Sequence, residues 1–162
     1  MRNALKLFAL LPLLFTIHSC TVSKAARTMK QEINGTWMLE TINTEGISGK
    51  VTATLFNEAS FNCFVGSSWN FVANTSTGTY NINASGTECV ATQRLIKWSI
   101  YEPAGEAKQF QFKRMADNKK SMDDDTGFRF EIATLTNTNM QLKSHITFEG
   151  HPAVYVFNFV KK

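Results

Sequence analysis

The fold is decided by residues 69–83, WNFVANTSTGTYNIN. An aromatic-rich run, 69–72, and an alternating run, 79–83, flank a connection rich in Asn, Thr, Ser and Gly. Alternation at period two places one face of a strand on a core and the other in water, and such a connection is typical of a hairpin turn. This stretch therefore predicts two neighbouring antiparallel strands.

The same pattern continues on both sides of this hairpin. Further strands are predicted at 37–42, 96–100, 110–113, 128–132, 140–143 and 155–159. About eight strands with short turns and no long crossover favour antiparallel pairing, and a sheet of that size removes its exposed edges by closing. We therefore predict an all-β protein, an eight-stranded antiparallel up-and-down barrel. A two-sheet sandwich satisfies the same pattern.

Residues 50–62, KVTATLFNEASFN, do not fit the pattern clearly. They are compatible with a strand followed by a loop, or with a short helix that carries Leu55 and Phe56. We favour the strand, and no segment after residue 32 shows a convincing helical stripe of apolar residues.

The first twenty residues, MRNALKLFALLPLLFTIHSC, predict export. Two basic residues, Arg2 and Lys6, precede an apolar stretch that is too short to cross ~30 Å of hydrocarbon as a helix. This is typical of a removable signal peptide. The sequence Ile17-His18-Ser19-Cys20 resembles the lipobox of bacterial lipoproteins, in which a signal peptidase cuts before the Cys and acyl chains are attached to it. The resemblance implies a lipoprotein signal peptide at 1–19 and lipid attachment at Cys20.

The resemblance to lipoproteins also implies a location. We expect the protein to be bound to a membrane of the cell envelope through its N-terminal lipid. By analogy with enterobacterial lipoproteins, Thr21 stands where an Asp would indicate retention in the inner membrane, so we expect the outer membrane, facing the periplasm. Residues 20–32 are polar and basic and are predicted to form a tether, in which Ser23 is a candidate cap for a short helix.

The length of the remaining chain indicates one domain, which we place at 33–162, and its charge bears on the class of partner. Removal of residues 1–19 from the 162 leaves 143 residues, enough for a hydrophobic core. The whole chain carries 17 basic and 13 acidic side chains, and two of the basic ones belong to the signal peptide. The mature charge is therefore nearly balanced, which argues against a nucleic acid as partner.

Cysteine usage agrees with export. Once Cys20 is assigned to lipid, Cys63 and Cys89 remain as a single pair. An even number of cysteines in an oxidising compartment favours a disulfide, which would stabilise the fold by ~3 kcal/mol through closure of the loop between them. Two reduced, buried thiols are the alternative.

A family resemblance enters at Gly35-Thr36-Trp37. This stretch resembles the Gly-x-Trp opening of lipocalin barrels, in which the Trp closes one end of the barrel from the first strand. The order of later motif residues strengthens the resemblance. They are Cys63, Trp69, Phe71, Gly78, Tyr80, Cys89, Trp98 and the final Tyr-x-Phe-x-Phe-x-Lys of residues 155–161. Nearly the whole mature chain resembles the small lipocalin-like lipoproteins of bacteria. That family implies an eight-stranded barrel with a short helix, mostly without an assigned ligand.

In such a barrel the alternating aromatic residues face inward. Our candidates for a ligand site are Trp37, Leu39, Tyr80, Trp98, Phe112, Phe130, Leu142 and Phe157. Either Trp69 or its neighbour Val72 is also expected on the inner face. An eight-stranded barrel either fills with its own side chains or holds one small ligand. The leading hypothesis is a monomeric, non-enzymatic barrel that binds a small hydrophobic or amphipathic molecule in its lumen or at its mouth. The alternative is a solid-core envelope module that binds protein or glycan through its loops.

The sequence offers no pattern for catalysis or for a metal. It contains no Gly-x-Ser-x-Gly, no His-Glu-x-x-His and no Cys-x-x-Cys, so no catalytic residue, metal ligand or cofactor is predicted. Three consecutive acids at 123–125 lack the spacing of a calcium loop, and we interpret residues 113–127 as a solvated hairpin tip. The two mature histidines, His145 and His151, are expected at the surface.

Overall fold

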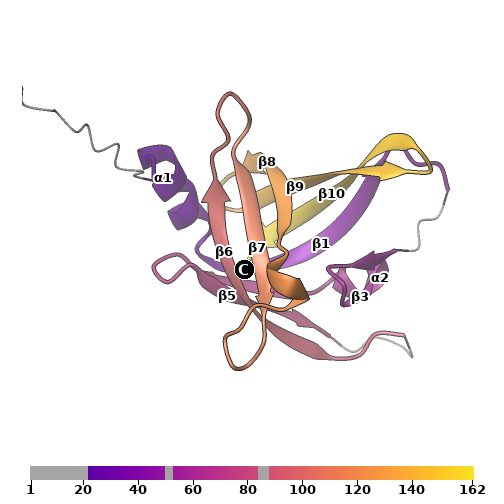
Figure 1. The fold of residues 1–162 in the computed structure, drawn as a ribbon, viewed down its shortest axis with the longest axis horizontal. Helices are drawn as coiled ribbons and strands as arrows, with labels where there is room; N and C mark the ends of the chain where they lie inside the picture. Colours follow the sequence, from indigo (N-terminus) through magenta and orange to yellow (C-terminus); the bar gives the residue numbers. More distant parts are fainter. Residues whose placement is uncertain (1–21, 50–52, 84–87) are drawn as a thin grey trace, which may run out of the picture.

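The computed structural model describes residues 22–49, 53–83 and 88–162 as a closed barrel (Figure 1). The predicted signal peptide and the lipid site at Cys20 lie outside these residues. The barrel order is β1-β10-β9-β8-β7-β6-β5-β4, and pairing of β1 with β4 closes it. Its strands are β1 (Gly35–Glu45), β4 (Ser68–Val72), β5 (Thr77–Ile82), β6 (Thr92–Tyr101), β7 (Gln109–Met115), β8 (Phe128–Leu135), β9 (Asn139–Phe148) and β10 (His151–Lys161). All neighbours are antiparallel, so the barrel prediction is confirmed and the sandwich is excluded.

The hairpin predicted at 69–83 is formed by β4 and β5. Trp69 lies opposite Tyr80, and Phe71 lies opposite Gly78. A Cβ atom added to Gly78 would stand 2.3 Å from the backbone oxygen of Asn70. The close approach of the two backbones therefore requires Gly at this position.

A helix covers one end of the barrel. It is α1 (Lys24–Ile33), and its N-cap Ser23 accepts a hydrogen bond from the Ala26 amide at 3.0 Å. Ala26 and Ile33 are fully buried. The helical alternative for residues 20–32 is thus the one that forms, and α1 packs as part of the folded domain. No helix in the described part of the chain has the length and apolar character needed to cross a membrane.

The long connection from β1 to β4 covers the opposite end. It contains β2 (Thr54–Leu55), β3 (Ala59–Ser60) and α2 (Phe61–Phe64). Figure 1 shows α1 and the β3–α2 segment on opposite sides of the barrel. In the described part of 50–62 the favoured strand is thus present as a minimal hairpin. The helix that follows begins only at Phe61 and does not carry Leu55 or Phe56.

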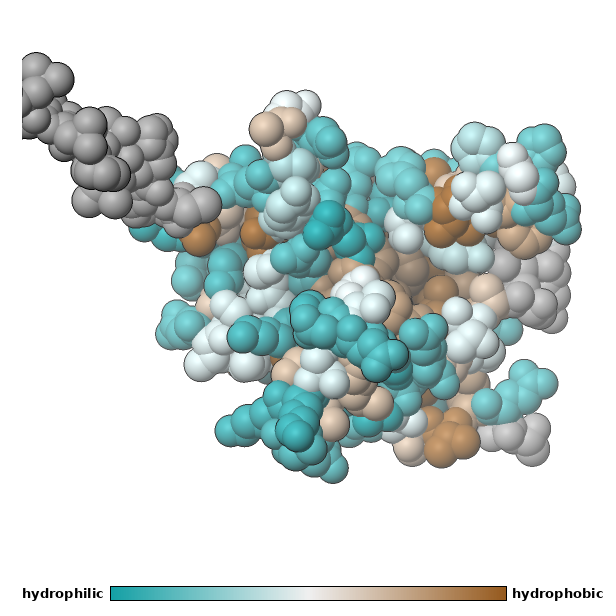
Figure 2. Space-filling view, in the orientation of Figure 1, coloured by the Kyte–Doolittle hydropathy of each residue, from teal (hydrophilic) through white to brown (hydrophobic). Residues whose placement is uncertain are grey.

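Aromatic side chains form the core between these two ends. Those with less than 2% of their surface exposed are Trp37, Trp98, Tyr80, Phe64, Phe71, Phe110 and Phe112. Hydrophilic side chains cover most of the face that Figure 2 shows, and hydrophobic ones appear in separate patches. The inward direction of the rings follows from the period-two alternation of each strand.

Candidate functional site

The lumen of the barrel is filled by side chains. The cavity left among its aromatic walls has a volume of about 10 Å³, which is the space of about one water molecule. Of the two alternatives for an eight-stranded barrel, the self-packed core is therefore the one observed. A ring that comes from a connecting turn, and not from a barrel strand, lies in this space.

The predicted ligand residues all lie inside the barrel but do not share one site. Each of the eight is at most 5% exposed. Phe112, Phe130, Leu142 and Phe157 line the small central cavity, whereas the other four, Trp37, Leu39, Tyr80 and Trp98, lie elsewhere in the core. On β4 the inward residue is Trp69, and its neighbour Val72 is 40% exposed. The role of the eight in binding stays a prediction.

The ring inside the lumen is that of Phe56, in the turn between β2 and β3. We call residues 54–60 the plug. The ring centroid of Phe56 lies 5.0 to 6.1 Å from those of Phe64, Trp69, Phe112, Phe128, Phe130 and Phe157. Its backbone is left-handed, with φ at 53°, as is that of Asn57 at 52°. A bulky residue in this conformation costs ~1–3 kcal/mol, so the packing of the ring holds the plug in a strained turn.

A carboxylate fixes the plug to the rim of the barrel. Arg94 donates two hydrogen bonds to Glu58, from Nε at 2.8 Å and from Nη2 at 2.7 Å. Arg114 donates a third from Nη1 at 2.8 Å, and the Tyr80 hydroxyl donates a fourth at 2.7 Å. Side chains of three neighbouring strands, β5, β6 and β7, thus converge on one carboxylate. Charge-assisted bonds of this kind are about twice as strong as neutral ones.

Asp123 completes this group, which we call the Glu58 cluster: Glu58, Tyr80, Arg94, Arg114 and Asp123. The Arg114 guanidinium donates through Nε to Asp123 at 2.8 Å and through Nη2 to the same carboxylate. Arg114 is 4% exposed, so its charge is balanced inside the protein by two carboxylates. The interpretation of 113–127 as a solvated tip is therefore wrong for Asp123, which turns back toward the barrel.

The electrostatics of the cluster keep the Glu58 and Asp123 carboxylates ionised and the Tyr80 hydroxyl protonated. Burial opposes ionisation of Glu58, but the hydrogen bonds from Arg94, Tyr80 and Arg114 outweigh it and lower the pKa of Glu58 to about 2. Burial and the Glu58 carboxylate raise the pKa of Tyr80 well above its usual value, so the hydroxyl stays a donor. The hydrogen bonds from Arg114 lower the pKa of Asp123. At neutral pH the plug is thus held by an ionised carboxylate.

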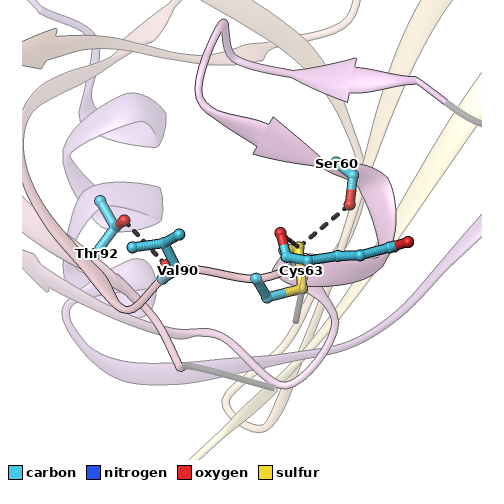
Figure 3. The surroundings of a disulfide bond; sticks show 6 residues. Ser60, Cys63, Val90 and Thr92 are labelled. Carbon is cyan, nitrogen blue, oxygen red and sulfur yellow. Dashed lines mark hydrogen bonds between the residues drawn. A yellow bond between two sulfur atoms is a disulfide. The ribbon is translucent and has the colours of Figure 1, made fainter. Parts of the chain in front are cut away.

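The predicted disulfide is confirmed and lies next to the plug (Figure 3). Cys63 of α2 is bonded to Cys89, and their Cα atoms are 5.4 Å apart. The Ser60 hydroxyl, at the end of the plug, lies 3.2 Å from the Cys63 sulfur. The bond therefore ties the chain that follows the plug to the connection that precedes β6.

Sequence reasoning missed the Glu58 cluster, although part of its signal was present. Arg114 continues the inward series of Phe110 and Phe112 at period two, and Arg94 does the same before Ile96 and Trp98. A charged residue at an inward position indicates a buried partner. The partner could not be identified, because Glu58 and Asp123 belong to segments without a clear periodicity.

The closed end is arranged around Trp37, as the family resemblance implied. The indole Nε1 donates to the backbone oxygen of Ile33 in α1 at 2.7 Å. The Lys161 ammonium lies 5.1 Å above the indole ring and donates to the backbone oxygen of Glu32 at 2.8 Å. A cation from the last strand therefore covers Trp37 and joins it to α1.

A groove lies on the outer surface of the barrel. Its volume is about 790 Å³, and it lies over β6, β7 and the start of β8. It is lined by polar side chains, including Lys97, Gln111, Lys113 and Arg129, and by apolar ones, including Trp98, Phe112 and Phe128. The described ranges contain no cluster of three or more His, Cys, Asp or Glu side chains arranged to hold a metal ion.

Comparison with known proteins places this geometry in a family. The model of the lipocalin-like domain family matches residues 33–142. No curated protein matches the chain. Among solved structures, a lipocalin-like protein from Bacteroides uniformis is similar at 15% identity and a TM-score of 0.46, over 81% of this chain and 99% of that one. The bovine odorant binding protein, in complex with a selenium-containing odorant, is similar at 12% identity and a TM-score of 0.41, over 82% and 72%. By the match of the family model, the chain belongs to the lipocalin-like domain family.

Proposed function

We propose that the barrel binds a small hydrophobic or amphipathic molecule, and that the ligand takes the place of the plug at the mouth. One observation supports this proposal above all. The ring that fills the centre of the lumen, Phe56, comes from a connecting turn and not from a barrel strand. The space for a ligand therefore exists in the architecture, and a displaceable segment of the same chain occupies it.

The plug is built to leave more easily than any barrel strand. Its strands, β2 and β3, pair with each other over two residues each and form a sheet separate from the barrel. It is attached to the barrel by the buried side chains of Leu55 and Phe56, by the Glu58 carboxylate and by Asn57. Asn57 donates to Asp123 and accepts a hydrogen bond from Arg114 through its backbone oxygen. Segments with few shared backbone hydrogen bonds open at a lower free energy than the core does. The strained turn at Phe56 favours release further.

The test measures binding and plug motion together in the folded wild-type domain. The neutral apolar probe N-phenylnaphthylamine should gain fluorescence on binding, and amide hydrogen exchange of residues 53–62 should rise at the same time. Exchange in the barrel strands should not change. The Phe56→Ala variant should bind the probe at least tenfold more tightly, because no ring has to be displaced.

A matched control lies in the same connection. Phe61 is also buried but packs on Tyr155, and it is not among the residues that line the central cavity. The Phe61→Ala variant should therefore bind the probe like the wild type. The proposal is overturned if the wild type binds no probe, including the case in which only Phe56→Ala binds, since that would be an engineered cavity alone. It is also overturned if the probe binds without any change in exchange of the plug.

The filled lumen favours one second candidate, the solid-core envelope module. Its surface would be the groove over β6, β7 and β8, where polar side chains stand beside aromatic ones, and a glycan can use both. A glycan array should then give hits with the wild type that Gln111→Ala weakens. An array without hits would remove this candidate.

The envelope location and the absence of catalysis belong to the same proposal. We place the protein on the outer membrane, facing the periplasm, attached through acyl chains on Cys20, and we assign it no reaction. Labelling with radioactive palmitate should mark the wild type and not Cys20→Ala, which should appear in the soluble fraction. Incorporation of the label into Cys20→Ala would contradict the anchor.

A further inference from the structure

We infer that the mouth of the barrel is a carboxylate site, and that the ligand is an amphipathic acid, an apolar chain that ends in a carboxylate. The inference deepens the proposed function and rests on it. Its basis is the Glu58 cluster. There the chain's own carboxylate accepts four hydrogen bonds from three residues, as the carboxylate of a ligand would.

The donors of this site belong to the barrel, whereas the carboxylate does not. Arg94 lies on β6, Arg114 on β7 and Tyr80 on β5, so the site persists when the plug leaves. Arg94 binds both oxygens of Glu58 side by side, which is the geometry that a guanidinium offers to any carboxylate. Tyr80 adds a neutral donor to one of these oxygens. A free carboxylate finds the same three partners.

The plug presents an acid and an apolar group together. Phe56 fills the cavity among Trp69, Phe112 and Phe157, and Glu58, two residues later, holds the rim. An amphipathic acid offers the same pair of groups, since its chain replaces the ring and its head group replaces the carboxylate. The side chains of Glu58 and Arg94 are 12% and 25% exposed, so the head-group site borders solvent.

Charge explains why a neutral ligand is at a disadvantage. When the plug leaves, Arg114 keeps Asp123, but Arg94 and Tyr80 lose the carboxylate that they bind. A partly buried guanidinium without its partner is costly, and an incoming anion removes that cost. An apolar alcohol of the same length fills the lumen but leaves Arg94 unpaired.

The experiment compares lauric acid with lauryl alcohol as competitors for N-phenylnaphthylamine in the wild type. The acid should displace the probe at a concentration about 10- to 100-fold lower than the alcohol does, because hydrogen bonds to charged groups contribute that much affinity. Arg94→Gln should reduce this preference about tenfold without weakening the alcohol, because only Arg114 and Tyr80 then remain as donors. Glu58→Gln should improve binding of the acid about tenfold, since the internal competitor loses its charge.

The control is Arg129→Gln, which removes the same charge from the outer face, where Arg129 lies over the Tyr101 ring. It should leave the preference intact. Equal potency of acid and alcohol in the wild type, or a preference that Arg94→Gln leaves unchanged, would overturn the inference while the proposed function stands. A wild type that binds no probe would overturn both, so the two failures are distinguishable.

Discussion

Replacement of Glu58 by Gln should destabilise the protein at neutral pH and should do so less as the pH falls. The change keeps the size of the side chain and removes the charge that Arg94 and Arg114 bind. The pKa of Glu58 lies at about 2 in the folded protein, against an ordinary value of 4.5. At about 1.36 kcal/mol per pKa unit, this difference corresponds to about 3 kcal/mol of stability. Solvent at the partly exposed Arg94 screens the pair, which reduces the expected loss to about 2 kcal/mol.

The sign of the pH dependence follows from the direction of the shift. A lowered pKa in the folded state means that the stabilisation is fully present above pH 4.5 and is lost as the pH falls toward about 2. Urea unfolding, followed by tryptophan fluorescence, should therefore give a free-energy difference between wild type and Glu58→Gln that is largest at pH 7 and close to zero near pH 2.

The matched control is Glu45→Gln. Glu45 forms an ion pair with Lys143 at 3.2 Å, but its side chain is 54% exposed, so the loss should stay below about 0.5 kcal/mol. A difference between wild type and Glu58→Gln that does not change between pH 7 and pH 2.5 would refute the reasoning. So would a Glu58→Gln variant as stable as the wild type at pH 7.

Three further predictions concern the closed parts of the fold. Replacement of Cys63 and Cys89 together by Ser should lower the free energy of unfolding by about 3 kcal/mol, measured in urea, and reductant should have the same effect on the wild type only. Trp37→Phe removes the hydrogen bond to α1 and should cost about 1–3 kcal/mol, with faster amide exchange in α1; unchanged exchange there would contradict its role in holding the helix. Gly78→Ala should cost about 1–3 kcal/mol in thermal unfolding because its Cβ meets backbone that cannot move, and a neutral result would show that the two strands separate without cost.

Sequence reasoning succeeded where the information is local. The alternation of residues 69–83 places Trp69 and Tyr80 opposite each other on the inner face, as the structure shows. Ser23 was a candidate cap for a helix and is the N-cap of α1. The pairing of Cys63 with Cys89 was favoured over two reduced thiols once Cys20 had been assigned to lipid, and the disulfide is present. In each case one residue type, or one period, is sufficient to specify the local structure.

It failed where segments without periodicity meet the barrel. Nothing in the sequence of residues 54–60 indicates that Phe56 adopts a left-handed backbone and enters the lumen. The charged run at 113–127 looked like a solvated tip, yet Asp123 binds the buried Arg114. Both contacts join residues that are far apart along the chain or depend on the exact path of a loop, and a pattern of alternation carries neither kind of information.

By itself the sequence determined the strands and the residues that share one face of each strand, because both follow from a period of two. It favoured a closed antiparallel sheet around a lumen, but a two-sheet sandwich satisfied the same pattern. Whether that lumen is hollow or filled was decided only by the tertiary structure. The volume inside a barrel depends on every side chain that reaches it, and the decisive ones, Phe56 and Glu58, arrive from a turn whose position is set by packing against Trp69, Phe112 and Arg94.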